Sequence, residues 1–392
     1  FGSIKEMKIT DVKTFKVFCY RTNWVFVKVY TDEGIDGVGE GTLEYKENAL
    51  EGAIEDLKRY LVGKNPLDIE LHYHNIYRDA YWRGGPVLMS ALSAVEQALW
   101  DIAGKALNVP VYRLLGGKVR DRIKIYVNGW FAGAKTPEEF AQKAKETVQM
   151  GVKAMKWDPF GKSYMEISNK ELNNALECIA AVRSAVGDEI DLLIEGHGRF
   201  NVPTAIKIAK ELECFKPMFF EEPIPPDNID ALAEVRSKSP VRIAAGERWY
   251  TRAGFREAFQ KSAVDYIQPD ISHAGGIMEC KKIAAMAEMH YIPFAPHNPS
   301  GPVANAATLQ LAACVPNFCI LEIMSTDVPW RKEITNESLQ YEDGCILIPD
   351  KPGIGLELNE ENCLKYPYEP RDLRHYTGAL TNIRPQEVIR YF

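Results

Sequence analysis

The feature that most restricts the fold of this chain is a regular alternation of short apolar segments with helical stretches from residue 123 onward. The interiors of these segments are almost wholly apolar, as is typical of parallel strands that are buried on both faces. Eight such segments separated by helices predict a closed parallel barrel. The expected strands cover residues 123–129, 152–158, 191–197, 218–224, 241–247, 264–270, 291–297 and 318–324.

The first part of the chain has a different pattern. Residues 8–40 alternate apolar and polar positions in three runs separated by turn residues, which predicts an antiparallel meander. Helices are expected at about 47–63 and at 88–107. In the second helix an apolar stripe recurs at intervals of three and four residues. It consists of Leu88, Leu92, Val95, Leu99 and Ile102.

These patterns divide the chain into three expected parts. An α+β domain covers residues 1–122, and a (β/α)7β TIM-like barrel covers residues 123–330. The alternation stops after about residue 330, so we expect residues 331–392 to return to the first domain and complete it. A length of 392 residues fits one large domain with a second, smaller element.

Composition and charge narrow the class of function. Hydrophobic and charged contents of 46% and 26% are those of a soluble globular protein. A net charge of −7 without a long basic run argues against nucleic-acid and membrane partners. The eight cysteines are scattered without a CxxC pair, which favours reduced thiols in a cytoplasmic protein. No apolar stretch reaches 18 residues, so no membrane span is expected.

Three carboxylates follow three of the apolar segments at an equal spacing. Glu195, Glu221 and Glu247 lie 26 residues apart, since 221 − 195 = 26 and 247 − 221 = 26. This interval is the length of one strand–helix repeat, so it predicts equivalent places on successive strands. Neighbouring carboxylates repel unless a cation neutralises them, and oxygen ligands without sulfur favour Mg²⁺. The alternative is that these are ordinary solvated acids at the starts of loops.

Two histidines at other strand ends are candidates for proton transfer. His297 ends the seventh strand beside Asp270, and a carboxylate on the far ring nitrogen would make His297 a general base. His197 lies two residues after Glu195, so in an extended strand both side chains would point to one face. From the opposite side of the barrel mouth, His197 could protonate a leaving hydroxyl. Otherwise His197 only braces the metal ligands, and His297 is structural.

These residues suit the chemistry of a sugar acid. Removal of the proton α to a carboxylate creates an ene-diolate, which a divalent cation stabilises. Loss of the 3-hydroxyl then requires an acid on the other face. Lys156 could contact the substrate carboxylate, and Glu322 could hydrogen-bond it when protonated. The alternative is that Lys156 and Glu322 are solubilising charges.

Long motifs make the chain resemble the mandelate racemase subgroup of the enolase superfamily, and within it the sugar-acid dehydratases. The likeness runs over essentially the whole chain and includes YWRGGPVLMSALSAVEQALWDIAGKALNVPVYRLLGGKVRDRI, EGHGRF, FFEEP, AAGERWYTR, IQPDISHAGGI, FAPHNPSGP and KPGIGLEL. The resemblance implies dehydration of an aldonic acid of the D-galactonate or D-gluconate type to a 2-keto-3-deoxy acid. It implies one Mg²⁺ per subunit, a homo-oligomer between dimer and octamer, and the same roles for the carboxylates and histidines.

Two departures from the family pattern bear on the chemistry. Glu195 stands where aspartate is common, which places the first ligand one methylene further out. Where racemases have Lys-x-Lys, this chain has Lys156-Trp157-Asp158, and the missing second lysine favours dehydration over inversion. A racemase or epimerase with His197 and His297 as two bases is the first rival function. The second rival is a non-catalytic protein that binds a sugar acid or a cation.

The resemblance also implies that the first domain caps the barrel and contacts the distal end of the substrate. The loop from Tyr20 to Trp24 and the segment from Tyr81 to Gly85 would supply these contacts. The residues expected to bind substrate are Tyr20, Trp24, Trp82, Arg83 and Asp158.

Overall fold

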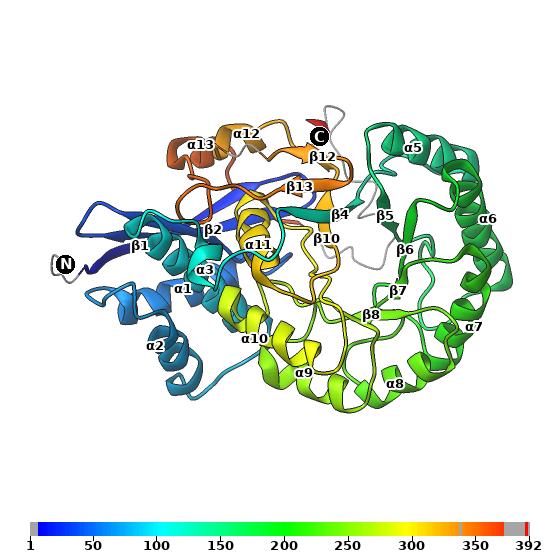
Figure 1. Cartoon of the computed structure of the whole chain (residues 1–392), viewed down its shortest axis with the longest axis horizontal. Helices are drawn as coiled ribbons and strands as arrows, with labels where there is room; N and C mark the ends of the chain where they lie inside the picture. Colours follow the sequence, from blue (N-terminus) through cyan, green and yellow to red (C-terminus); the bar gives the residue numbers. More distant parts are fainter. Residues whose placement is uncertain (1–6, 337–338, 372–388, 391–392) are drawn as a thin grey trace.

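The computed structural model describes residues 7–336, 339–371 and 389–390 and shows an α+β cap beside a (β/α)7β barrel (Figure 1). The cap opens with an antiparallel sheet in the order β1-β2-β3, which confirms the predicted meander. Its strands are β1 (Ile9–Phe18), β2 (Asn23–Thr31) and β3 (Asp36–Glu40). Its helices are α1 (Glu47–Leu61), α2 (Ile69–His74), the π-helical turn η1 (Asn75–Asp79), α3 (Pro86–Ala106) and α4 (Val111–Leu114).

Helix α3 differs from its predicted amphipathic stripe. It is buried at every position from Met89 to Gly104, whereas Leu88, the first residue of the predicted stripe, is 45% exposed. The helix packs against β3 on one side and against the barrel helix α10 (Gly276–Glu288) on the other. Glycines in β3 allow this approach, because a Cβ at Gly39 would lie 1.8 Å from the carbonyl oxygen of Ala94.

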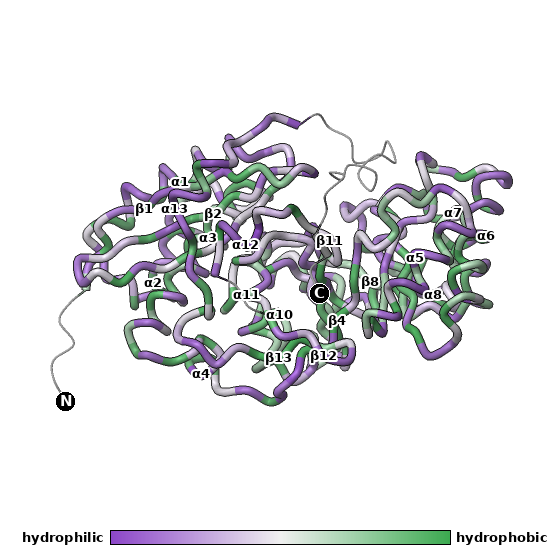
Figure 2. Tube along the Cα trace, turned by 90° about the horizontal axis from the view of Figure 1, so that it is seen from above, coloured by the Kyte–Doolittle hydropathy of each residue, from purple (hydrophilic) through white to green (hydrophobic). Residues whose placement is uncertain are grey.

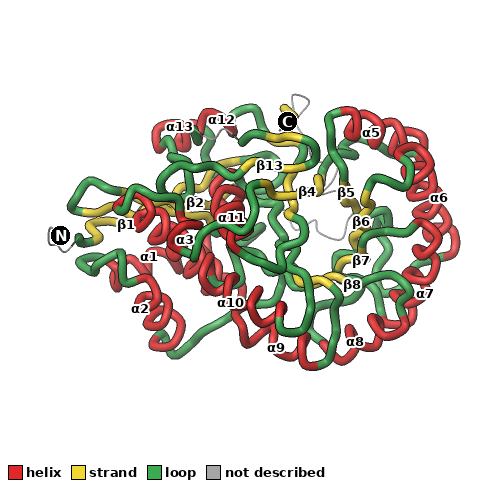
Figure 3. The backbone as a smooth tube through the Cα atoms, viewed as in Figure 1, coloured by secondary structure: helices red, strands yellow, loops and turns green. Residues whose placement is uncertain are grey.

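The barrel forms where the alternation predicted it (Figure 3), with helices around a ring of strands. Strands β4 to β9 pair in sequence order, and β10 pairs in parallel with β4 to close the ring. The strands are β4 (Arg122–Asn128), β5 (Ala154–Trp157), β6 (Asp191–Glu195), β7 (Phe219–Glu221), β8 (Ile243–Ala245), β9 (Tyr266–Ile267) and β10 (Leu321–Met324). The other helices are α5 (Pro137–Gln149), α6 (Asn169–Val186), α7 (Val202–Leu212), the 3-10 turn η2 (Glu213–Phe215), α8 (Ile229–Lys238), α9 (Thr251–Gln260) and α11 (Pro302–Cys314).

The seventh barrel position departs from the prediction. Instead of a strand over 291–297, only Phe294 pairs, through isolated bridges to Ile267 and Phe318. Pro293 and Pro296 lack the N–H groups that a central strand would donate to its neighbours, so a regular ladder does not form. The start of α5 is specified locally, because Thr136 and Glu139 form a capping box.

The last part of the chain contacts both the cap and the barrel. Its elements are β11 (Thr326–Asp327), α12 (Arg331–Ile334), β12 (Tyr341–Glu342), β13 (Cys345–Leu347), α13 (Glu360–Lys365) and β14 (Ile389–Arg390). The expected return to the cap is present, since the amide of Phe18 donates to the carbonyl of Tyr366. Before that return, β13 pairs antiparallel with barrel strand β4, an addition that the sequence did not predict. Residues 337–338, 372–388 and 391–392 of the expected C-terminal segment lie outside the described residues.

The core follows this layout. In Figure 2 the outer barrel helices mix hydrophilic and hydrophobic positions, as expected for helices with one buried face. A separate apolar cluster fills the barrel with one residue from each of its eight positions. Its members are Tyr126, Ala154, Leu193, Phe219, Ala244, Tyr266, Ala295 and Ile320. Among the described residues, no helix combines the length and apolar character that crossing a bilayer requires.

Candidate active site

A polar layer lies two residues further along most of the barrel positions. Side chains in a strand alternate between faces, so a residue two places beyond an inward-facing one also faces inward. The residues two places after the apolar cluster are Asn128, Lys156, Glu195, Glu221, Gly246, Gln268, His297 and Glu322. The apolar cluster therefore forms the floor on which an ionisable site is built at the C-terminal ends of the strands.

The three predicted carboxylates come together. One oxygen each of Glu195, Glu221 and Glu247 lies within 4.8 Å of the others. Glu195 and Glu221 are direct register partners, as the 26-residue spacing predicted. The same inference is wrong for Glu247, because the register partner of Glu221 is Ala244.

The backbone after β8 explains how Glu247 still reaches the cluster. Gly246 occupies the inward-facing place and has a φ of +140°, a conformation that side chains rarely allow. A Cβ there would lie 2.9 Å from the amide nitrogen of Gln268. The strand ends at Ala245, and the chain turns at the glycine, so Glu247 reaches the other carboxylates from beyond the strand end.

Lys156 is surrounded by carboxylates. Its Nζ lies 2.5 Å from Oε1 of Glu221 and 3.2 Å from oxygens of both Glu195 and Glu322. Burial alone would lower the pKa of Lys156, but Glu221 and Glu322 outweigh it and raise the pKa well above its usual value. One ammonium group cannot neutralise three carboxylates. The predicted contact of Lys156 with a substrate carboxylate stays a prediction.

The electrostatics of the cluster fit a divalent cation. Burial raises the pKa of Glu221 well above its usual value, and the charge of Glu195 adds to this effect. Burial likewise raises the pKa of Glu195 to about 7. Both carboxylates are thus costly to ionise with the protein's own charges. A hard cation held by these oxygens would remove that cost, so the donor set suits Mg²⁺.

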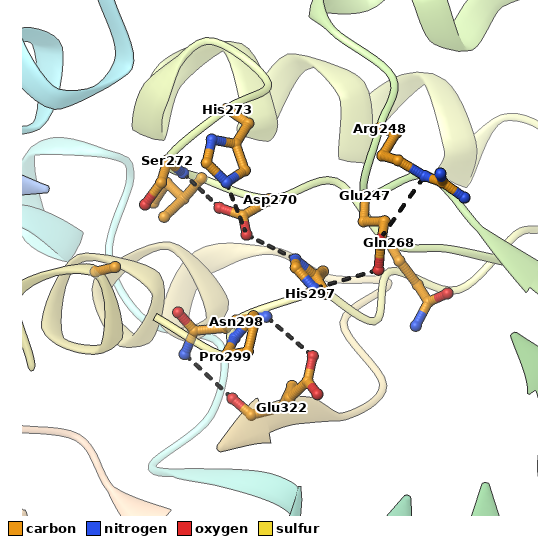
Figure 4. Close-up of polar contacts among 12 residues, drawn as sticks. Glu247, Arg248, Gln268, Asp270, Ser272, His273, His297, Asn298, Pro299 and Glu322 are labelled. Carbon is orange, nitrogen blue, oxygen red and sulfur yellow. Dashed lines mark hydrogen bonds and ion pairs between the residues drawn. The ribbon is translucent and has the colours of Figure 1, made fainter. Parts of the chain in front are cut away.

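His297 and the buried Asp270 form a pair beside the cluster (Figure 4). The Nδ1 of His297 donates to Oδ2 of Asp270 over 2.7 Å, and the amide of Ser272 donates to Oδ1 over 2.7 Å. The Nε2 of His297 lies 3.2 Å from Oε2 of Glu247. Burial would lower the pKa of His297, but Glu247 and Asp270 outweigh it and raise the pKa to about 10.

His197 stands across the barrel mouth on a different backbone from the one predicted. Strand β6 ends at Glu195, and His197 is in the left-handed region with a φ of 51°. Its amide donates to Oε1 of Glu195 over 2.6 Å, and its Nδ1 lies 2.6 Å from Oδ2 of Asp158. Glu195 and His197 line the same cavity, but through a tight turn rather than through strand alternation.

Glu322 is fixed by two donors. The side-chain amide of Asn128 donates to its Oε1 over 3.0 Å, and the amide nitrogen of Asn298 donates to its Oε2 over 3.2 Å. Burial would raise the pKa of Glu322, but Lys156 and His297 outweigh it and lower the pKa. This lowered pKa favours the carboxylate form of Glu322, and its protonation in a substrate complex stays a prediction.

A cavity of about 320 Å³ lies above the carboxylates, between barrel and cap. The cap lines it with Arg21, Thr42, Leu43, Glu44 and Tyr45.

Four of the predicted substrate-binding residues lie outside the cavity lining. Trp24 is only 3% exposed and packs in the core beneath Arg331. Trp82 is 78% exposed, and Arg83 stacks on Tyr77. Tyr20 packs against the core of the cap. Asp158 does line the cavity. Of the two predicted cap segments, only the loop from Tyr20 to Trp24 reaches the cavity, and it does so through Arg21. The individual residues could not be predicted, because side-chain direction within an irregular loop has no sequence period.

Sequence reasoning missed several polar residues of the site. Gln268, which donates to Oε2 of Glu221 over 2.7 Å, and Asn128 were detectable, because both follow the strand alternation. His273 and Arg248 also line the cavity, from loops after strand ends. Arg199 is 1% exposed beneath the site, and no sequence signal distinguished it from a surface arginine.

A capped barrel with a carboxylate cluster at its strand ends defines the enolase superfamily. Residues 139–362 match the family described as "Enolase C-terminal domain-like". Residues 10–116 match "Mandelate racemase / muconate lactonizing enzyme, N-terminal domain". The chain belongs to the mandelate racemase group of this superfamily, as its motifs indicated.

Similar proteins extend over most of the chain. A D-gluconate dehydratase of Thermoproteus tenax is 38% identical over 351 residues, which cover 89% of this chain and 71% of the relative. A D-galactonate dehydratase of Pectobacterium atrosepticum is 38% identical over 362 residues, with coverage of 91% and 93%. A solved structure of an enolase-superfamily member from Salmonella Typhimurium has a TM-score of 0.88 at 33% identity, covering 92% of this chain and 98% of that chain.

Proposed function

We propose that this protein is a Mg²⁺-dependent sugar-acid dehydratase that converts an aldonate of the D-galactonate or D-gluconate type to its 2-keto-3-deoxy acid. Its curated relatives are hydro-lyases at 38% identity over most of the chain, and the chain is an enzyme of that class. The observation that carries the proposal is the placement of two histidines on opposite sides of one carboxylate cluster. An elimination needs a base and an acid in such positions.

Glu195, Glu221 and Glu247 would hold the cation, which would bind the substrate carboxylate and stabilise negative charge on it. A cation held by these residues would also affect the pKa of His297. At about 10, an imidazole is protonated at neutral pH and cannot act as a base. The negative charge of Glu247 is the largest effect that raises the pKa of His297. A cation beside Glu247 would offset that charge and lower the pKa, so His297 would become an effective base.

In the first step Nε2 of His297 takes the α-proton, and the C–H electron pair enters the carboxyl group as an ene-diolate. Asp270 holds the opposite ring nitrogen throughout, so the imidazole keeps its orientation. In the second step the ene-diolate electrons form a C2–C3 double bond while the C3–O bond breaks. His197 gives a proton to the departing oxygen, which leaves as water, and the resulting enol tautomerises to the 2-keto acid.

The rival is an epimerase that uses both histidines as bases. Incubation of the enzyme with Mg²⁺ and a panel of aldonic and aldaric acids in D2O separates the two functions. Dehydration yields a 2-keto acid that has lost the 3-hydroxyl, whereas epimerisation inverts C2 and retains it. Solvent deuterium at C2 of recovered acid without any keto acid, across the whole panel, would contradict the proposal. Binding without turnover or exchange would instead support the non-catalytic rival.

We further propose one cation per subunit and a homo-oligomer. Isothermal titration with Mg²⁺ gives the number of cations per subunit, and sedimentation equilibrium of the same preparation gives the number of subunits. A stoichiometry of two cations per chain, or a monomer at micromolar concentration, would contradict these assignments.

A further inference from the structure

His197 is held in place by a polar pair that consists of the partly buried Asp158 and the buried Arg199. Asp158, just after β5, accepts from the ring through Oδ2, and Arg199 donates from Nη2 to both oxygens of Asp158, over 2.7 Å and 2.8 Å. The amide of Phe160 donates to Oδ1 over 2.9 Å. Every oxygen of the carboxylate is therefore engaged by the protein itself.

Arg199 is fixed as firmly as the group it holds. Its side chain is 1% exposed, its Nη1 donates to the carbonyl of Gly161 over 2.8 Å, and its Nε donates to the carbonyl of Gly196 over 3.1 Å. A buried guanidinium with all these donors placed is a rigid support. The arrangement ties the loop after β5 to the loop after β6, which contains His197.

The same design appears on the other side of the cavity. Asp270 engages Nδ1 of His297 over 2.7 Å, and Asp158 lies 2.6 Å from Nδ1 of His197. A carboxylate only accepts, so Nδ1 carries a proton in each ring. Whatever else His197 contacts must then meet Nε2.

We propose that Asp158, braced by Arg199, is a positioning residue that orients His197 for protonation of the departing 3-hydroxyl, rather than a residue that binds substrate. This inference rests on the proposed function. It assigns the protein two aspartate–histidine pairs with separate tasks, in which Asp270 serves removal of the α-proton and Asp158 serves loss of water.

Asp158→Asn tests this role with little change in shape. Phe160 and Arg199 both need an oxygen at the Oδ1 position, so the new amide nitrogen must face Nδ1 of His197. The neutral ring would then take the tautomer in which Nδ1 is unprotonated and accepts from the amide, and the doubly protonated ring that serves as the acid would be disfavoured. In D2O with Mg²⁺ and the aldonate that the wild type dehydrates, we expect formation of keto acid to fall about 100-fold or more. The rate of α-proton exchange should stay within about threefold of the wild-type rate, which is a small change compared with the loss of one proton transfer.

Three further arms make the result specific. Asp270→Asn should lose exchange and dehydration together. Arg199→Lys, which keeps the charge but not the two-point grip, should reduce dehydration less than Asp158→Asn while leaving exchange in place. A 3-deoxy-3-fluoro substrate, whose fluoride leaves without a full proton transfer, should restore much of the elimination by Asp158→Asn.

The outcomes separate this inference from the proposed function. If the wild type makes keto acid and Asp158→Asn does so equally well, the positioning role is wrong and the dehydratase stands. If Asp158→Asn loses exchange and elimination in parallel while its thermal unfolding matches the wild type, Asp158 acts on the whole site and the inference is also wrong. A wild type that exchanges the α-proton without eliminating would overturn both. A fourth readout needs no substrate, since ¹⁵N spectra of the His197 ring should show Nδ1 protonated in the wild type and not in the variant.

Discussion

The two histidines differ in the step that each would serve. His297 lies next to a carboxylate of the cation cluster, whereas His197 lies in the turn after β6, on the opposite side of the barrel. We expect His297→Ala to lower both α-proton exchange and keto-acid formation by about 100-fold or more, since each proton transfer contributes that much. His197→Ala should lower keto-acid formation alone. Mass spectrometry of substrate and product from D2O distinguishes them, and full dehydration by either variant would contradict its assignment.

The double acid Glu221-Glu222 allows a matched test of the cation site. Glu221 joins the cluster, while its neighbour Glu222 is equally buried but pairs with Arg248. A ligand that binds only the folded state stabilises it, so Mg²⁺ should raise the melting temperature of the wild type and EDTA should abolish activity. Glu221→Gln should lose the Mg²⁺-dependent rise. Glu222→Gln should keep it despite a lower starting value, and an identical response of both variants would count against the assignment.

Single residues were predictable where strand alternation placed them. Glu195, Glu221 and Glu322 each follow an inward-facing apolar residue by two positions. His297 follows the same rule even though its segment forms only isolated bridges. Arg199 and Arg21 obey no such rule, because loops fix their direction.

At the scale of elements, a strand of the cap domain provides the side chain that caps the N-terminus of a barrel helix. Glu40, the last residue of β3, accepts at Oε1 from the amide of Gly301 over 2.7 Å and at Oε2 from the amide of Ala304 over 2.8 Å. These amides open α11, which lacks a capping side chain of its own. The preceding loop contains His297, so Glu40 links the cap sheet to the base.

Glu40→Gln should therefore destabilise the protein, because an amide cannot accept at both positions. A buried N–H left without a partner costs about 1–3 kcal/mol.

Burial raises the pKa of Glu40 to about 7 from 4.5, although Thr42 and the two amides oppose this effect. A raised folded-state pKa gives stability that is full below pH 4.5 and is lost as the pH rises through about 7. The stability advantage of wild type over variant, measured by urea unfolding, should shrink across that window. An advantage that grows with pH would contradict the shift.

Elements were predicted best where local pattern and tertiary setting agree. The capping box at Thr136 specifies the start of α5 without help from the rest of the fold. Helix α3 was identified but its burial was not, since a stripe marks one contact face and this helix packs against the cap sheet, α1 and the barrel helix α10. At the seventh barrel position, the two prolines near Phe294 allow only isolated bridges instead of a regular strand. These prolines were visible in the sequence, but the regular strand–helix alternation led us to expect a full strand.

For the whole molecule, the cap completes the site. Arg21 pairs with Glu44 at the cavity wall and donates from Nη2 to the carbonyl of Pro299, two residues after His297. It therefore joins the cap to the loop that contains the proposed base. A guanidinium placed there would interact with the bound acid in ground and transition states alike.

Arg21→Met should raise the KM for the aldonate about 10- to 100-fold with a smaller change in kcat, because a hydrogen bond to a charged group contributes about 1.5–3 kcal/mol. Trp82→Ala is the control, since this cap residue is exposed and lies outside the cavity lining. Steady-state kinetics should show Trp82→Ala close to wild type. The reverse pattern would restore the segment from Tyr81 to Gly85 as the specificity contact.

The barrel, the order of its strands and the ionisable residues at the strand ends could be predicted from the chain alone, because a two-residue period and a strand–helix repeat are local properties. Tertiary structure alone decided how Glu247 joins the cluster, since the turn at Gly246 replaces the equal register that the spacing suggested. It also decided which cap residues reach the cavity and that Asp158 faces His197. Those contacts join loops from different strands, and the direction of a side chain in a loop depends on the neighbours that pack around it rather than on any period in the chain.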